Sequence, residues 1–195
     1  MGFQLKGRVV FFATNNINKF DEARRVLTGC GIAVGMLRVK CLEVQSDSLE
    51  EIAGASAVDA FGRCHLPVVA EDAGLFVEAL DGFPGPYAAY VYRTIGNLGL
   101  LKLMEGVRVR RARFVSVVAY FSAELGSPVC FSGVVEGGIA ERERKGSGRA
   151  GFGFDPVFRP FGSEETFAEM GVEEKNRCSH RADAFRKFGE WYKRI

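Results

Sequence analysis

The chain has 195 residues, of which 47% are hydrophobic and 26% charged, a balance typical of a folded globular protein and not of a disordered one. Its net charge of +2 at pH 7 is too small for a protein whose main partner is a nucleic-acid polymer, although a small anionic ligand remains possible. The five cysteines are scattered without a Cys-x-x-Cys pair, and the first residues lack the apolar segment of a signal peptide. We therefore expect one reduced, cytoplasmic domain that does not span a membrane.

A polar turn between the first expected strand and the first expected helix predicts a phosphate site. Residues 8–13 form a continuous apolar run typical of a central strand, and apolar side chains then recur at helical spacing from Ile17 until Gly29. The first amides of a helix lack internal partners and attract anions. The alternative is an asparagine N-cap beside a solvated lysine. The candidate phosphate-binding residues of this turn are Thr14, Asn15, Asn16 and Lys19.

A candidate metal ligand precedes the second expected helix. A second strand is predicted over residues 33–39, and a capping box that begins at Ser48 predicts a helix to about residue 63. Glu43 stands among apolar neighbours just before this helix. Because carboxylate oxygens suit hard cations, Glu43 is a candidate metal ligand, and an exposed loop carboxylate is the alternative.

The stretch Val68–Leu75 carries the most informative carboxylates of the chain. A short apolar run ends in Glu71 and Asp72 and is followed by a small residue and Gly74, which predicts a buried strand that delivers charge at its end. Successive strand side chains point to opposite faces, so only one of the two carboxylates faces a given site. We predict that Asp72 binds a metal ion or accepts a proton and that Glu71 has a supporting role. The alternative is a strand that ends at a solvated acidic turn. Residues 75–80 are expected to form a second strand that continues past a bend at Gly74.

The middle of the chain predicts two helices and a basic strand start. Residues 87–95 form a helix with three tyrosines, which we interpret as core or as a subunit interface and not as a binding box. A short amphipathic helix is predicted over residues 100–104. The basic run over residues 108–113 is interpreted as the exposed start of a strand and not as a nucleic-acid patch.

The remainder of the chain predicts a meander and a terminal helix. Strands are expected over residues 114–123, 129–135 and 138–142. Ser179 is the expected N-cap of a helix that runs to about residue 193.

Two segments near the C-terminal end supply candidates for a base-binding site. Two aromatic side chains and a carboxylate crowded around a glycine can sandwich a planar base and bind its edge, and the alternative is a core turn that packs two phenylalanines. These residues are Phe152, Gly153, Phe154 and Asp155. A group of hydrogen-bond donors follows, namely Lys175, His180 and Arg181.

Five motifs, in order and spacing, resemble those of the Ham1/inosine triphosphate pyrophosphatase family, and the resemblance covers essentially the whole chain. They are Thr14-x-Asn16-x-x-Lys19, Glu71-Asp72-Ala73-Gly74-Leu75, Pro84-Gly85-Pro86-Tyr87, Phe152-Gly153-Phe154-Asp155-Pro156 and Lys175-Asn176-x-x-Ser179-His180-Arg181. The segment over residues 92–96 looks most like that of archaeal members.

The resemblance implies a fold and an activity. The fold is α/β, with an elongated central mixed sheet flanked by helices and two lobes with the active-site cleft between them, built as a single two-lobed domain over residues 1–195. The implied activity is hydrolysis of the abnormal purine nucleoside triphosphates ITP, dITP and XTP to the monophosphate and pyrophosphate, with Mg²⁺ as the cofactor. Members of the family are typically homodimers.

The resemblance also implies roles for single residues. The turn from Thr14 to Lys19 binds the phosphates, Glu43 and Asp72 hold the metal, and Asp72 accepts the proton of the attacking water. The base and its neighbourhood are held by residues 152–155 together with Lys175, His180 and Arg181. Two positions depart from the family pattern. Ala73 replaces a common serine or threonine next to the substrate, and Ser56 stands where many members carry a lysine.

The chemistry of the base agrees with these roles. Hypoxanthine and xanthine present an oxygen where adenine presents an amino group, so a pocket of donors favours the first two, by about 10⁴–10⁵-fold in sites built on hydrogen-bond matching. Two alternatives remain open: a Maf-like pyrophosphatase that acts on other modified nucleotides, and a nucleotide-binding or single-stranded nucleic-acid-binding protein without catalysis. The mild net charge disfavours polymer binding.

Overall fold

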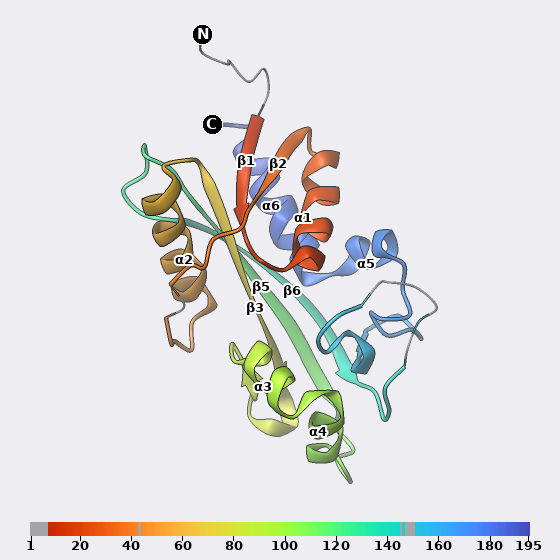
Figure 1. The fold of residues 1–195 in the computed structure, drawn as a ribbon. Helices are drawn as coiled ribbons and strands as arrows, with labels where there is room; N and C mark the ends of the chain where they lie inside the picture. Colours follow the sequence, from red (N-terminus) through yellow and green to blue (C-terminus); the bar gives the residue numbers. More distant parts are fainter. Residues whose placement is uncertain (1–7, 43, 145, 147–150) are drawn as a thin grey trace. The chain divides into compact units, whose positions relative to one another are not determined.

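A computed structural model describes residues 8–42, 44–144, 146 and 151–195. In this described chain a seven-stranded sheet has the strand order β2-β1-β3-β5-β6-β7, and β4 pairs with β3 (Figure 1). β1 runs parallel to β2 and β3, whereas the pairs β3–β4 and β6–β7 are antiparallel. The predicted mixed α/β class is therefore confirmed.

The elements have the following bounds. The strands are β1 (Arg8–Ala13), β2 (Ile32–Leu37), β3 (Val68–Val77), β4 (Pro84–Gly85), β5 (Arg111–Phe121), β6 (Val129–Ile139) and β7 (Phe158–Pro160). The helices are α1 (Ile17–Gly29), α2 (Leu49–Cys64), α3 (Ala88–Thr94), α4 (Gly96–Leu103), α5 (Val172–Cys178) and α6 (His180–Tyr192), with short 3₁₀ turns at Glu78–Leu80 and Asp155–Val157. Among the described residues, no helix has both the length and the apolar character that a membrane span requires.

The chain divides into two compact units whose boundaries fall inside β3, β5, β6 and α6. The first unit comprises Met1–Asp72, Ser116–Gly133 and Arg181–Ile195, and the second comprises Ala73–Val115 and Val134–His180. Each unit has its own apolar core.

In the first unit, helices cover both faces of the central strands. Val10 and Phe12 of β1 pack in one cluster with Leu27 of α1 and Phe185 of α6. Ala13 points to the other face, where α2 covers the sheet. Alternate side chains of β1 are thus buried on opposite faces, which explains why its sequence is apolar without interruption.

The second unit has a core formed by strand residues and by the short helices α3 and α4. Leu75 and Phe114 of the strands pack in one cluster with Val91 of α3 and Leu100 of α4. Three phenylalanines form its centre, because the ring of Phe158 lies 4.6 Å from that of Phe114 and 5.2 Å from that of Phe167.

The N-terminal elements agree with their predicted bounds. β1 and α1 begin and end where the apolar pattern placed them, and β2 and α2 shift by at most two residues at their ends. Ser48 caps α2 by accepting a hydrogen bond from the amide of Glu51 at 3.2 Å. The carboxylate of Glu51 accepts from Ser46 at 2.6 Å, so that only half of the expected capping box forms.

The prediction of a strand that ends at Asp72 and bends at Gly74 is wrong. β3 is a single ten-residue strand that continues to Val77, so both carboxylates lie in its middle. A Cβ at Gly74 would stand 2.7 Å from the carbonyl oxygen of Gly85. The glycine therefore allows β4 to approach β3 closely and does not mark a bend.

Three further boundaries differ from the prediction. α4 begins at Gly96, whose φ of +61° forms the joint with α3. The third meander strand is not at residues 138–142. β6 extends to Ile139 and pairs with β7 in an antiparallel arrangement. β7 can approach closely because residue 137 is a glycine, since a Cβ there would meet the backbone of Arg159. Helix α5, which precedes the confirmed terminal helix α6, was not predicted.

Candidate functional site

The turn between β1 and α1 is ordered by its own polar side chains. Asn16 is the N-cap of α1, and its Oδ1 accepts hydrogen bonds from the amides of Asn18 at 3.0 Å and Lys19 at 3.2 Å. The amide of Asn16 donates to Thr14 Oγ1 at 3.1 Å, and Asn15 Nδ2 donates to the carbonyl of Val39 at 3.1 Å. The asparagine cap weighed as an alternative is therefore present, and it occupies two of the amides that would attract an anion.

Lys19 is not a solvated lysine. Its ammonium lies 2.9 Å from the Oε2 atom of Glu71 and donates to the carbonyl oxygen of the same residue at 3.4 Å. The side chain retains 21% exposure. Because an ammonium has three donors, one remains after these two contacts, and among the described residues no partner takes it.

Glu71 lies at the centre of a buried charge network in the first unit. Its Oε1 atom accepts hydrogen bonds from Ser116 Oγ at 2.6 Å and from Arg181 Nε at 3.0 Å. Burial disfavours the charged form, but the positive charges of Arg181 and Lys19 and the hydrogen bond from Ser116 outweigh it and lower the pKa of Glu71 to about 2. Glu71 is therefore ionised at neutral pH and serves the structure, as strand alternation predicted.

Arg181 joins α6 to α1 as well as to β3. Its NH1 group lies 2.6 Å from Glu22 Oε2, and both side chains are nearly fully buried. Glu22 was not among the residues predicted to take part in a site. The available signal was the spacing between Lys19 and Glu22, which places both on one face of the helix.

Asp72 lies next to this network but on the opposite side of β3. Its burial is intermediate, as is that of Ala73, whereas the side chain of Glu71 has no exposed surface. Alternation along the strand thus separates the two carboxylates as expected. Glu43, the second predicted metal ligand, lies outside the described residues.

The described part of the chain contains no group of three or more His, Cys, Asp or Glu side chains that could hold a metal ion by itself. The carboxylate of Glu71 is occupied by two cations and a hydroxyl group. Asp72 remains as a partly exposed carboxylate of this unit. Such a donor set fits a hard divalent cation of the Mg²⁺ type, which takes one or two carboxylates and completes its shell with water and substrate phosphates.

The second unit contains the other predicted cluster. Asp155 Oδ2 lies 2.6 Å from Lys175 Nζ in an ion pair that is almost fully buried, and it also accepts the amide of Phe152 at 2.8 Å. The ammonium of Lys175 lies 4.8 Å from the centroid of the Phe152 ring and 5.3 Å from that of Phe167. This arrangement fixes the position of Phe152, which is itself only partly buried.

Phe154 and His180, two other members of the predicted base site, are buried, whereas Gly153 is partly exposed. Phe154 retains 3% exposure and packs edge-on against Tyr92 at 5.5 Å, so it takes the core position weighed as its alternative. Gly153 has a φ of +62°, and its carbonyl accepts from Asn97 Nδ2 at 3.3 Å. His180 retains 2% exposure and stacks on Phe114 at 4.6 Å with an interplanar angle of 9°.

The predicted cluster of three donors is thus distributed over the two units. Lys175 bonds to Asp155, and His180 stacks in the core of the second unit. Arg181 belongs to the first unit and is bonded there to Glu22 and Glu71. Lys175 and Arg181 therefore hold carboxylates of the protein in place. The residue types alone did not indicate these contacts.

Comparison with known proteins identifies the family of this arrangement. A model of the Ham1 family matches residues 10–191. The chain belongs to the Ham1 family. The chain is 53% identical over 184 residues to a dITP/XTP pyrophosphatase of Methanopyrus kandleri, which covers 94% of this chain and 96% of the relative. It is 50% identical over 187 residues to a dITP/XTP pyrophosphatase of Hyperthermus butylicus, covering 96% of each protein. The predicted likeness to archaeal members is confirmed.

Solved structures of the Ham1 family share the fold. A HAM1 protein from Coxiella burnetii has a TM-score of 0.83 at 27% identity, covering 96% of this chain and all of the other. A nucleoside-triphosphatase, or dITP/XTP pyrophosphatase, from Mycobacterium abscessus has a TM-score of 0.69 at 30% identity, covering 92% of this chain and 98% of the other.

Proposed function

We propose that the chain hydrolyses ITP, dITP and XTP to the nucleoside monophosphate and pyrophosphate. Membership of the Ham1 family and 53% identity to a dITP/XTP pyrophosphatase support this activity. The observation that carries the proposal is the ion pair of Lys19 with Glu71, because it ties the polar turn before α1 to the strand segment that bears Asp72. A phosphate-binding turn and a partly exposed carboxylate are thereby held in one compact unit.

The turn and Lys19 bind the polyphosphate chain in this proposal. The remaining donor of the Lys19 ammonium is available to a phosphate oxygen. Thr14, Asn15 and Asn16 shape the turn through the hydrogen bonds of their side chains, and Asn16 accepts one from the backbone amide of Lys19. A positive charge at this position offsets the negative charge that repels an attacking water from phosphorus.

Asp72 acts as the general base. It accepts a proton from water while the water oxygen bonds to phosphorus, and the bridging oxygen between the α- and β-phosphates leaves with the pyrophosphate. General-base help of this kind contributes about 10²–10⁴-fold. Asp72, with Glu43 as the expected second ligand, would hold Mg²⁺, which would offset the negative charge of the phosphates.

The base is bound by the cluster of the second unit. Its purine ring stacks on the exposed part of Phe152, and Asp155 and Lys175 hold that side chain in position. His180, which stacks on Phe114 in the same unit, also belongs to the proposed base-binding site. Ala73 contacts the substrate through its backbone, because it lacks the hydroxyl group that many members carry there.

The chain acts as a homodimer in the cytoplasm in this proposal. The aromatic helix α3 supports self-association, since Tyr90 is 59% and Tyr92 44% exposed, and neighbouring Leu98 of α4 is 72% exposed. Among the described residues, which include all five cysteines, no disulfide bond forms, as expected in a reducing compartment.

A substrate panel tests the proposal. ITP, XTP, dITP, GTP, ATP and dUTP are incubated with the protein and Mg²⁺, and the products are identified. We expect IMP and pyrophosphate from ITP, and little turnover of ATP. Orthophosphate as the first product would exclude cleavage between the α- and β-phosphates, and preference for dUTP would indicate a different class of nucleotide.

A further inference from the structure

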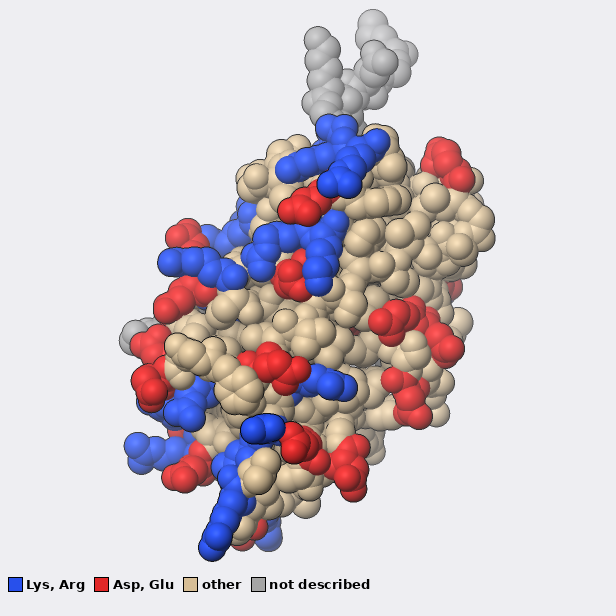
Figure 2. All heavy atoms as spheres, turned by 180° about the vertical axis from the view of Figure 1, so that it is seen from behind, with Lys and Arg blue, Asp and Glu red and all other residues tan. Residues whose placement is uncertain are grey.

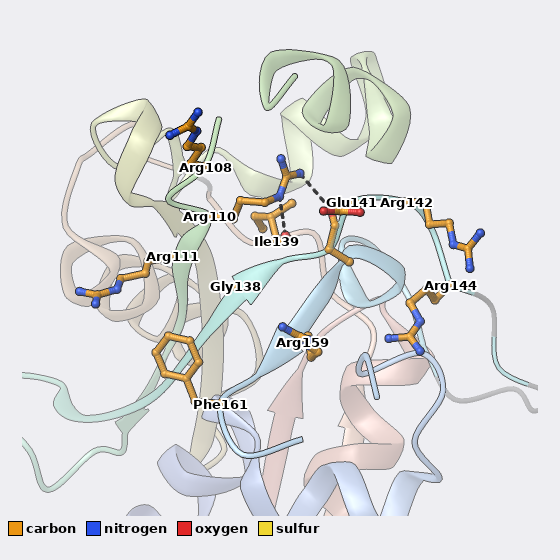
Figure 3. Close-up of a pocket in the computed structure, with 11 residues that line it drawn as sticks. Arg108, Arg110, Arg111, Gly138, Ile139, Glu141, Arg142, Arg144, Arg159 and Phe161 are labelled. Atoms are coloured by element: carbon orange, nitrogen blue, oxygen red, sulfur yellow. Dashed lines mark hydrogen bonds between the residues drawn. The ribbon is translucent and has the colours of Figure 1, made fainter. Parts of the chain in front are cut away.

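A second concave site, in the second unit, is lined mainly by arginines. The pocket has a volume of about 610 Å³ and lies where β5 begins, β6 ends and β7 runs beside it (Figure 3). Its charged side chains are Arg108, Arg110, Arg111, Arg142, Arg144, Arg159 and the single carboxylate Glu141. Six positive charges against one negative charge exceed the net charge of +2 of the whole chain. None of these residues takes part in the proposed nucleotide site.

Strand register brings three arginine-bearing segments together. The amide of Ile139 at the end of β6 donates to the carbonyl of Arg110 at 2.8 Å, which places the start of β5 beside the end of β6. Arg159 of β7 lies opposite Gly138 of β6. The segment after β6 carries Arg142 and Arg144 to the other side of the pocket (Figure 3). The basic run before β5 is thus one wall of a pocket and not only an exposed strand start.

Arg110 is fixed by backbone carbonyls. Its Nε donates to Ile139 at 2.8 Å, one terminal nitrogen donates to Met104 at 2.7 Å, and the other donates to Ala140 at 3.0 Å. These contacts set the orientation of the guanidinium without neutralising its charge. Within the described residues no carboxylate forms an ion pair with Arg110, so the pocket contains a preorganised positive charge.

The neighbouring arginines are also poorly neutralised. In the part of the chain that the structure describes, Arg108, Arg111 and Arg142 form no ion pair, and neither does Glu141. Arg159 has one long contact of 3.6 Å to a carboxylate, Glu164, whose side chain is 97% exposed. Arg144 alone has a close partner, Glu169, at 3.2 Å. Like charges that converge in a concave site repel one another and concentrate counter-anions.

We propose that this pocket binds a small polyphosphate anion. Guanidinium groups match phosphate oxygens in paired hydrogen bonds, and the volume falls within the ordinary range of small-molecule sites. Phe161 lines the pocket with 63% of its surface exposed, which offers a stacking face if the anion carries a base. An inorganic polyphosphate and the phosphate chain of a nucleotide share this chemistry.

The composition of the pocket favours a small ligand over a polymer. A nucleic acid would need a continuous basic track. Over the face shown in Figure 2, Lys and Arg side chains are interspersed with Asp and Glu and form no such track. At the pocket, six arginines and one glutamate line a single hollow, so the excess of positive charge there is local.

Calorimetry of the full chain with inorganic tripolyphosphate, in metal-free buffer, tests the proposal. The variant R108Q/R142Q removes two exposed arginines that bond to no other described residue, and R93Q/R194Q removes the same charge elsewhere. We expect R108Q/R142Q to bind tripolyphosphate at least about tenfold more weakly than the wild type and to lose most of the thermal stabilisation that tripolyphosphate gives. The control R93Q/R194Q should match the wild type in both measurements. Turnover of ITP without added tripolyphosphate should be equal in both variants.

Two further variants identify the binding site and the source of the anion. In Lys19→Gln, which alters the proposed nucleotide site, tripolyphosphate binding to the pocket should persist. ATP serves as a second probe. If the pocket binds nucleotides, ATP should bind more tightly than tripolyphosphate, and Phe161→Ala should weaken the binding of ATP. If the pocket binds inorganic polyphosphate, Phe161→Ala should have no effect.

Three results would overturn the proposal. One is equal tripolyphosphate affinity in R108Q/R142Q and R93Q/R194Q, and another is loss of all binding in Lys19→Gln. The third is a single-stranded oligonucleotide that binds far more tightly than tripolyphosphate through the same arginines, since it would assign the pocket to nucleic acid.

Discussion

Replacing Glu71 by glutamine should destabilise the fold while leaving the proposed catalytic carboxylate in place. The Glu71 carboxylate has no exposed surface and contacts Lys19, Arg181 and the hydroxyl group of Ser116. Glutamine keeps the shape of the side chain but removes the negative charge that faces two cations. Removing one partner of a buried ion pair costs about 3–5 kcal/mol, because the other charge stays buried without compensation.

The pKa of Glu71 gives a similar magnitude and predicts how it depends on pH. The group has a pKa of about 2 in the folded protein against an ordinary value of 4.5. A carboxyl group whose pKa is lowered by folding stabilises the protein above pH 4.5, and this contribution is lost as the pH falls from 4.5 toward 2. The difference corresponds to roughly 3 kcal/mol at neutral pH. The stability gap between wild type and Glu71→Gln should therefore narrow over this range.

Urea unfolding followed by circular dichroism at a series of pH values measures this gap. Glu190→Gln is the matched control, because Glu190 is an exposed carboxylate of the same unit and forms no hydrogen bond or ion pair with another described residue. Thermal unfolding is a second measurement of the same loss. At neutral pH, a loss of roughly 3 kcal/mol should lower the midpoint of thermal unfolding of Glu71→Gln by roughly 6–12 °C relative to the control. A variant as stable as the control, or a gap that does not change with pH, would refute the argument that paired charges hold Glu71 ionised.

Three other substitutions have distinct expected outcomes. Asp72→Asn should lower pyrophosphate release from ITP by about 10²-fold or more, and near-normal turnover would remove Asp72 from its role. Lys175→Met leaves Asp155 buried without its cation, so urea unfolding should show a loss of about 3–5 kcal/mol, with a lower preference for ITP over ATP in kcat/KM. Asn16→Ala removes the cap of α1 and should cost about 1 kcal/mol, whereas an unchanged unfolding midpoint would show that the cap contributes little.

Local patterns predicted that the two carboxylates of β3 point to opposite faces, but not which residues they contact. Alternation was sufficient to separate Asp72 from Glu71, because it is a property of any extended strand. The partner Arg181 lies 110 residues away from Glu71 in sequence, and no local periodicity encodes a contact of that range. The continuity of the strand was missed because Gly74 resembles a turn signal, whereas its function is to accommodate the backbone of Gly85.

In the second unit, local sequence patterns likewise failed to predict how the aromatic residues pack. The motif over residues 152–156 indicated correctly that Phe152 and Asp155 lie close together, since the amide of one bonds to the carboxylate of the other. It could not indicate which ring is buried, because Phe154 enters a core formed by segments distant in sequence. Its exposure depends on packing partners such as Tyr92, which the motif does not contain.

The pKa of Glu71 also bears on which carboxylate receives the proton. A general base works best when its pKa lies near the working pH, and a group whose pKa is about 2 holds a proton too weakly to serve well at neutral pH. Lys19 and Arg181 would oppose protonation of Glu71 further, because both would lose their carboxylate partner. Asp72 is turned away from Glu71 by strand alternation and is partly exposed to solvent, from which the attacking water comes. The charge network therefore makes Glu71 a poor base, and this supports the proposal that Asp72 accepts the proton on grounds other than a resemblance between sequences.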